Sequence, residues 1–176
     1  EAGVDLCVAG KFKDNQDERG LLNDGIHLID AMRWFCGGDF VEVEAYAAFS
    51  DPHKEKTLVA EVRFDTGALG VFTMSRSAGQ WMEVVELHGG GRSARIDFPS
   101  TFEFITQSKV EVSDFKAKDW AWAIDVPWKG GFTQELEHFF ECVRTRKEPL
   151  TSGRDALKTH RLVNEIYRCA GLPLLD

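Results

Sequence analysis

Clustered positive charge, long apolar runs and a cleavable leader pattern are all missing from this sequence. Lys and Arg together number 21 against 29 Asp and Glu, so the net charge is -8. Nucleic-acid binding depends on clustered Lys and Arg, and the acidic balance therefore argues against a nucleic-acid partner. No apolar stretch approaches the length of a membrane span, and the start does not resemble a signal peptide, so we predict no membrane partner.

Paired cysteines are also missing. Cys7, Cys36, Cys142 and Cys169 are scattered, and no two of them form a CxxC pair of the kind that binds zinc. None of the five histidines has a second ligand-type residue at metal-binding spacing, so we predict no metal site. We expect free, buried thiols in a reducing compartment, which favours a cytoplasmic protein.

The apolar residues change their period along the chain. Residues 4–12 read as a strand, and Leu28, Ala31, Met32 and Phe35 then fall on one face of a helix. Asn23 or Asp24 could cap that helix, and residues 37–38 are glycines that could end it. Helical periods return only near the end, in residues 136–143 and 156–167.

Between these helices the helical period disappears. Residues 41–47 alternate between apolar and polar, as in a half-buried strand. Hairpin turns are predicted at residues 65–67 and 89–92, a third strand pair at 102–115, and a last edge strand at 120–126. The fold class is therefore α+β: one domain over residues 1–176, with a large open, mostly antiparallel sheet and its helices packed on one face.

The glycine-rich fingerprint of a dinucleotide-binding turn, GxGxxG, is absent. Residues 89–91 are three consecutive glycines, but no helix follows them, and a hairpin turn is the simpler interpretation. We therefore predict no cofactor-binding residue in this chain.

His27 is the strongest candidate for chemistry. It lies at the border of the apolar helix face, with Asn23 four residues before it and Asp30 three residues after it on the same stripe. Histidine exchanges protons near neutral pH, and an amide or carboxylate neighbour can orient its ring for acid-base work. By itself the pattern is more typical of a hydrogen-bonded helix histidine with no catalytic role, and Asn23 could be only a cap. Arg76 could hold substrate hydroxyls, although most such side chains are solvated.

The order of motifs along the chain resembles the C-terminal domain of the glucose-fructose oxidoreductase/inositol dehydrogenase/rhizopine catabolism (Gfo/Idh/MocA) family. The resemblance covers nearly the whole chain. It is carried by residues 20–38 with 41–45, by the strand-turn-strand at 64–70, and by the closing segments 132–139, 149–156 and 165–171.

This resemblance implies an oxidoreductase acting on a sugar, a nucleotide sugar or a cyclic polyol. It implies a cofactor, NAD or NADP, held mainly by an N-terminal Rossmann domain, and a homodimer or tetramer formed through the open sheet face. His27 matches the family's catalytic histidine, and Asn23 stands where many members have Asp. Asp24 or Asp30 could replace that carboxylate, although their directions on the helix differ, and we include both, with Arg76, among the substrate-binding candidates.

The sequence begins with Glu1 and opens directly on a strand-like run. We expect a piece of a longer polypeptide that lacks its Rossmann domain and is inactive when isolated. The alternative is a stand-alone, non-catalytic binding or dimerisation module, in which His27 is structural.

Overall fold

The structure is a computed structural model that describes residues 3–12, 20–51, 53–98, 101–114 and 132–174. The predicted edge strand at 120–126 lies outside these residues. The strands are β1 (Leu6–Phe12), β2 (Phe40–Asp51), β3 (Lys54–Phe64), β4 (Leu69–Ser75), β5 (Met82–Gly89), β6 (Arg92–Phe98), β7 (Thr101–Ile105) and β8 (Val110–Asp114). The helices are η1 (Leu21–Gly25), α1 (Ile26–Cys36), α2 (Phe132–Thr145) and α3 (Gly153–Cys169).

The described strands form one open sheet in the order β2-β3-β4-β1-β5-β6-β7-β8. Each pair is antiparallel except β1 and β4, which run parallel because η1 and α1 return the chain across the sheet before β2 begins. The predicted α+β class and the mostly antiparallel sheet are therefore confirmed. The position of β1 in the middle of the sheet could not be inferred from the sequence order.

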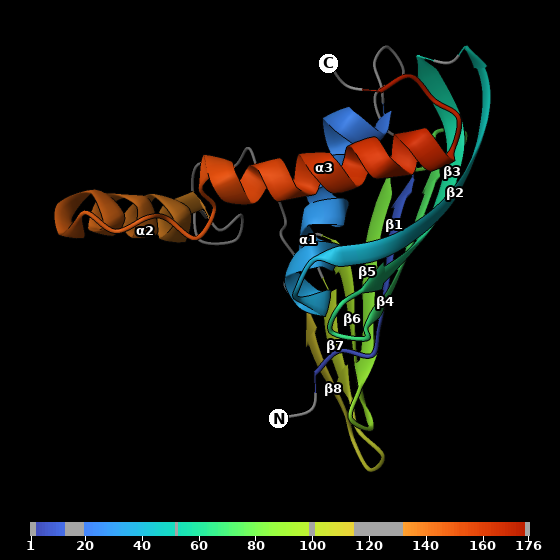
Figure 1. Ribbon diagram of the computed structural model, residues 1–176. Coiled ribbons are helices and arrows are strands. Elements are labelled where there is room, and N and C mark those ends of the chain that lie inside the picture. The colour runs from blue at the N-terminus through green and yellow to red at the C-terminus, as the bar shows by residue number, and fades with distance from the viewer. Residues whose placement is uncertain (1–2, 13–19, 52, 99–100, 115–131, 175–176) are drawn as a thin grey trace.

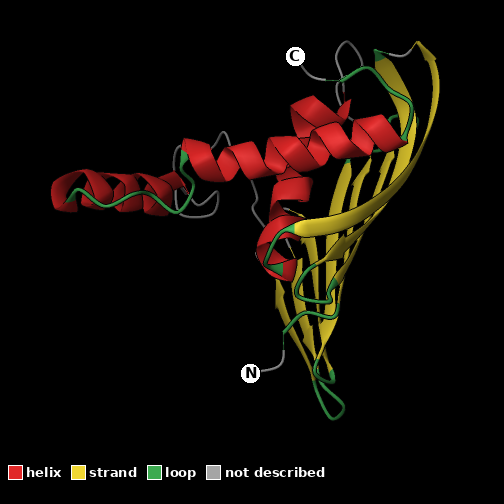
Figure 2. Cartoon of the chain, in the orientation of Figure 1, coloured by secondary structure: helices red, strands yellow, loops and turns green. Residues whose placement is uncertain are grey.

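Helices α1 and α3 cover one face of the sheet, while α2 extends away from the sheet (Figure 1; Figure 2). The covered face is apolar because alternate residues of each strand point toward the helices. On β3 these are Leu58, Ala60, Val62 and Phe64, each no more than 1% exposed. No helix in the described part of the chain is both long enough and apolar enough to cross a membrane.

The predicted hairpins form as expected from their turn residues. Gly67 has φ +87° between β3 and β4, and Gly90 and Gly91 have φ +57° and +72° between β5 and β6. Two successive positive φ values belong to the turn type that matches the twist of antiparallel strands. The three glycines at 89–91 therefore make a hairpin, as predicted.

Gly70 leaves room for the side chain of Met32 from α1. A Cβ atom on Gly70 would clash with the Met32 sulfur and lie 3.2 Å from the Phe64 ring, so a side chain there would force Met32 to move. Helix α1 ends as predicted, because Gly37 adopts φ +68° and donates its backbone N–H to the Arg33 carbonyl.

Two thiols meet beneath α1. Cys7 on β1 and Cys36 at the end of α1 are both buried, and Cys142 is buried in α2, as expected, whereas Cys169 is half-buried. The hydrogen bond with Cys36, together with burial, raises the pKa of Cys7 above its ordinary value. The Cys7 thiol therefore stays protonated and acts as a packing group.

A buried carboxylate joins three elements at the end of the sheet where β3 begins. Glu55 is 1% exposed. Its Oε1 accepts the backbone N–H of Leu21 at 2.8 Å and the hydroxyl of Tyr167 at 3.1 Å. Glu55 thus connects β3 to the first residue of η1 and to α3. The negative charge also suits the N-terminus of a helical segment, where backbone N–H groups lack partners.

Replacing Glu55 tests this connection. Glu55→Ala leaves a backbone N–H and a hydroxyl buried without an acceptor, and we expect it to lower the free energy of unfolding by about 2–4 kcal/mol. Glu55→Gln keeps one acceptor oxygen and should cost about 1 kcal/mol. Glu61→Ala, an exposed position on the same strand, is the control. Urea denaturation measures all three, and equal losses for Glu55→Ala and Glu61→Ala would contradict the role.

Candidate functional site

The segment that carries the candidate residues begins with a π-helical turn. Residues Leu21–Gly25 form η1, and α1 continues from it without a break. Gly25 precedes α1 in a helical conformation, and no side chain caps either segment. The prediction that Asn23 or Asp24 caps the helix is therefore wrong, because the helical path starts earlier and both residues lie within it. Single π turns inside helices occur frequently at functional sites.

His27 lies in the first turn of α1, at the mouth of a hollow between α1 and α3. Its side chain is exposed, and it makes no hydrogen bond or ion pair with the residues that the structure describes. The hollow has a volume of about 190 Å³. Its lining comprises Ile26, His27, Asp30, Thr151, Asp155, Ala156, Thr159 and His160. The sequence thus identified two of its polar residues, His27 and Asp30.

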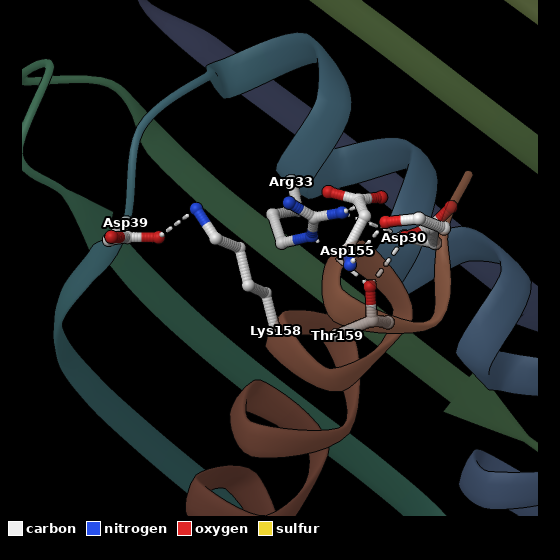
Figure 3. A network of polar contacts seen from close by, with 7 residues as sticks. Asp30, Arg33, Asp39, Asp155, Lys158 and Thr159 are labelled. Atoms are coloured by element: carbon white, nitrogen blue, oxygen red, sulfur yellow. Dashed lines mark hydrogen bonds and ion pairs between the residues drawn. The ribbon is translucent and has the colours of Figure 1, made fainter. Parts of the chain in front are cut away.

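Three lining residues, Asp30, Asp155 and Thr159, belong to a network centred on Arg33 (Figure 3). The Arg33 guanidinium donates to Asp155 Oδ2 at 2.6 Å and to Asp30 Oδ1 at 3.3 Å, and its Nε donates to Thr159 Oγ1 at 3.1 Å. The Thr159 hydroxyl in turn donates to Asp30. These contacts join α1 to α3 through residues that lie more than 120 positions apart in the chain.

The three charged side chains of this network differ in their exposure to solvent. The Arg33 side chain is 10% exposed, against 44% for Asp30 and 28% for Asp155. Burial by itself lowers the pKa of Arg33, but the hydrogen bond and charge of Asp155, with those of Asp30, outweigh it and raise this pKa. Arg33 therefore remains a cation between two carboxylates. Asp30 is held by Arg33 and Thr159, so its first role is to orient α1 against α3.

The other predicted site residues lie apart from the hollow. Asn23 is exposed and Asp24 half-exposed in η1. Arg76 follows β4, is 7% exposed, and donates its backbone N–H to the Lys56 carbonyl. Among the described residues, the lining of the hollow includes none of these three. Arg76 is thus a buried residue near the end of the sheet where η1 begins, rather than a solvated surface group.

Sequence reasoning missed the contribution of α3. Ser152 caps this helix by accepting the N–H of Asp155 at 3.3 Å. The residues of α3 at the hollow recur at helical spacing, but nothing in the sequence relates them to α1. Within the described part of the chain, no group of three His, Cys, Asp or Glu side chains could hold a metal ion.

Comparison with known proteins assigns a family. Residues 8–95, half of the chain, match the family model of the GFO/IDH/MocA C-terminal domain. The D-apiose dehydrogenase of Paraburkholderia graminis is 28% identical over 166 residues, which cover 88% of this chain and 44% of that protein. The chain therefore spans less than half the length of this relative.

Solved structures show the same fold. An oxidoreductase from Agrobacterium radiobacter in complex with NAD+, L-tartaric acid and magnesium has a TM-score of 0.78 at 20% identity, and the match covers 96% of this chain and 55% of that one. A levoglucosan dehydrogenase in complex with NADH and levoglucosan has a TM-score of 0.76 at 16% identity, covering 96% of this chain and 57% of that one. The match of the family model to half of the chain shows that the chain belongs to the Gfo/Idh/MocA oxidoreductase family and corresponds to its C-terminal domain.

Proposed function

We propose that this chain is the substrate-facing domain of an NAD- or NADP-dependent oxidoreductase that acts on a sugar, a nucleotide sugar or a cyclic polyol. The observation that carries the proposal is the placement of His27. Its imidazole has no protein partner among the described residues and lies at the mouth of a polar hollow, directly after a π turn. The family of the chain and the dehydrogenase names of its relatives support the same reaction class.

The glycine run of this chain does not supply a dinucleotide-binding turn. The glycine run at 89–91 lies in a hairpin turn, so it offers no helix N-terminus to a pyrophosphate. We propose that a Rossmann domain in the same polypeptide binds the dinucleotide, consistent with relatives about twice as long as this chain. When bound, the nicotinamide supplies the hydride acceptor for alcohol oxidation.

The proposed task of His27 is to handle the proton. Oxidation of a substrate hydroxyl releases one proton as the hydride leaves the carbon, and an imidazole within hydrogen-bond reach can accept it. Asn23 is exposed in the preceding turn and makes no hydrogen bond to the His27 ring in this structure, so we propose that its amide turns to the ring or to the substrate when the substrate binds. Unlike a carboxylate, the amide cannot stabilise the charged imidazolium.

Substitution of His27 tests the assignment. In the polypeptide that joins this chain to its proposed cofactor domain, His27→Ala should lower kcat by about 100- to 10,000-fold, because the general base is removed. Binding of NAD(H), followed by fluorescence titration, should be unchanged. Turnover within twofold of the parent enzyme would overturn the catalytic role of His27, whereas a parent polypeptide that oxidises no sugar or polyol would favour a non-catalytic module.

Asn23 gives a weaker, separable effect. Asn23→Ala should lower kcat about 10-fold, less than His27→Ala, because an orienting amide is lost while the base remains. The double variant should be hardly worse than His27→Ala, since Asn23 would act through His27. Steady-state kinetics of the two single variants and the double variant measure this. Fully additive losses would show that Asn23 acts independently of the imidazole.

We also propose that the open sheet face joins copies of the chain. This face carries the exposed Tyr46, Val59 and Leu69, with exposed fractions of 73%, 39% and 49%. Exposed apolar side chains on neighbouring strands are typical of an interface. An exposed ion pair between Glu42 and Arg63 lies on the same face.

Charged substitutions on this face should separate the copies. Tyr46→Asp with Leu69→Asp places two carboxylates in the proposed interface, and sedimentation equilibrium should show a dissociation constant raised at least 100-fold. Leu157→Asp, at an exposed apolar position of α3 on the opposite side, is the matched control. A parent protein that is monomeric at high concentration would contradict the interface.

A further inference from the structure

The hollow beside His27 has two kinds of polar residues. Asp30, Asp155 and Thr159 are tied to one another through Arg33. By contrast His27, Thr151 and His160 line the same hollow without a hydrogen bond or ion pair to any described residue. The first group is fixed by internal hydrogen bonds and the second is not. A ligand can therefore bind to His27, Thr151 and His160 without first breaking internal contacts.

Helix α3 changes its role along its length. Its second half packs on the sheet through Leu162, Val163, Ile166 and Tyr167, all buried. Its first half turns toward α1 instead, and there Asp155 and Thr159 contact Arg33. His160, which adjoins Thr159, is exposed at the hollow. No packing requirement explains an imidazole at this position, since the side chain is outside the core.

The chemistry of the unengaged groups matches hydroxyls. An imidazole with one protonated nitrogen donates one hydrogen bond and accepts another, and a threonine hydroxyl does both. Sugar and polyol hydroxyls also donate and accept. The hollow, at about 190 Å³, is smaller than the range of about 300–1,000 Å³ for sites that enclose drug-sized ligands. It suits one sugar or polyol ring rather than a whole nucleotide sugar.

We propose that the first half of α3, with Thr151 just before its N-cap, forms the second wall of the substrate site, where His160 and Thr151 bind ring hydroxyls adjacent to the one that faces His27. Asp155 is a positioning residue in this arrangement, because it acts through Arg33 to hold α1 and α3 in fixed relative positions. The inference rests on the proposed oxidoreductase function and adds two substrate-binding residues from a part of the chain that the family model match, residues 8–95, does not include.

The test is a comparison of KM and kcat in the polypeptide that contains the cofactor domain. A panel of aldoses and cyclic polyols first identifies an oxidised substrate by NADH or NADPH formation. With that substrate, His160→Ala should raise KM at least 10-fold and change kcat less than threefold, because binding is lost while the base remains. Thr151→Val should raise KM about fivefold. His27→Ala should show the opposite pattern, with a loss in kcat.

Arg161→Ala is the matched control, since Arg161 is an exposed neighbour of His160 on α3 that does not line the hollow. Its KM should stay within twofold of the parent value. Thermal unfolding midpoints close to the parent value would show that His160→Ala and Thr151→Val remain folded.

If His27→Ala loses turnover while His160→Ala and Thr151→Val keep the parent KM, the second wall is refuted and the proposed function stands. If no member of the panel is oxidised, the proposed function fails and the inference fails with it. If His27→Ala keeps full turnover, the oxidoreductase function stands but His27 is not its base, and a second wall opposite His27 is refuted. A rise in KM for His160→Ala that Arg161→Ala reproduces would also overturn the assignment.

Discussion

The position of α1 on the parallel pair β1–β4 governs the rest of this structure. Met32 of the helix packs directly over Gly70, where the absence of a side chain leaves it room. Its C-terminal end is seated where Cys36 meets Cys7, and its path begins at Leu21, whose backbone N–H is bound by Glu55. These contacts fix both ends of the helical segment, and they therefore set which positions on it, His27 among them, face away from the sheet.

A second constraint is the crossing of α1 by α3. Arg33 satisfies two carboxylates and a hydroxyl from the two helices, so their relative position is set by hydrogen-bond geometry as well as by apolar packing. A guanidinium with several fixed donors is suited to this task, because each donor requires its acceptor in a particular direction. The hollow beside His27 adjoins this network, because Asp30, Asp155 and Thr159 also line it.

Local signals explain why much of the fold was predictable. The hairpins at Gly67 and Gly90 and the exit of α1 at Gly37 depend on positive φ values that glycine adopts without steric cost. On each strand, apolar residues that face the helices alternate with residues that face away, as in any half-buried strand. The π turn was not predictable, because it changes the helical path by one residue within a segment that still has helical composition. Exposed Leu136, Phe139 and Phe140 on α2 show that a helical apolar period need not imply burial against the sheet.

The sequence nominated His27 as a candidate because its neighbours on one helix stand at fixed spacing, and spacing along a helix is a local property. Local signals likewise indicated the α+β class and three of the seven pairs among the described strands, β3–β4, β5–β6 and β7–β8, since hairpins join residues that are close in the chain. Tertiary structure alone decided that β1 lies in the middle of the sheet, that Arg33 joins Asp30 to Asp155, and that His160 lies at the same hollow as His27. The physical reason is that these relations connect residues up to 133 positions apart, His27 and His160 being the farthest, and only the packing of α1 and α3 on a common sheet brings them together.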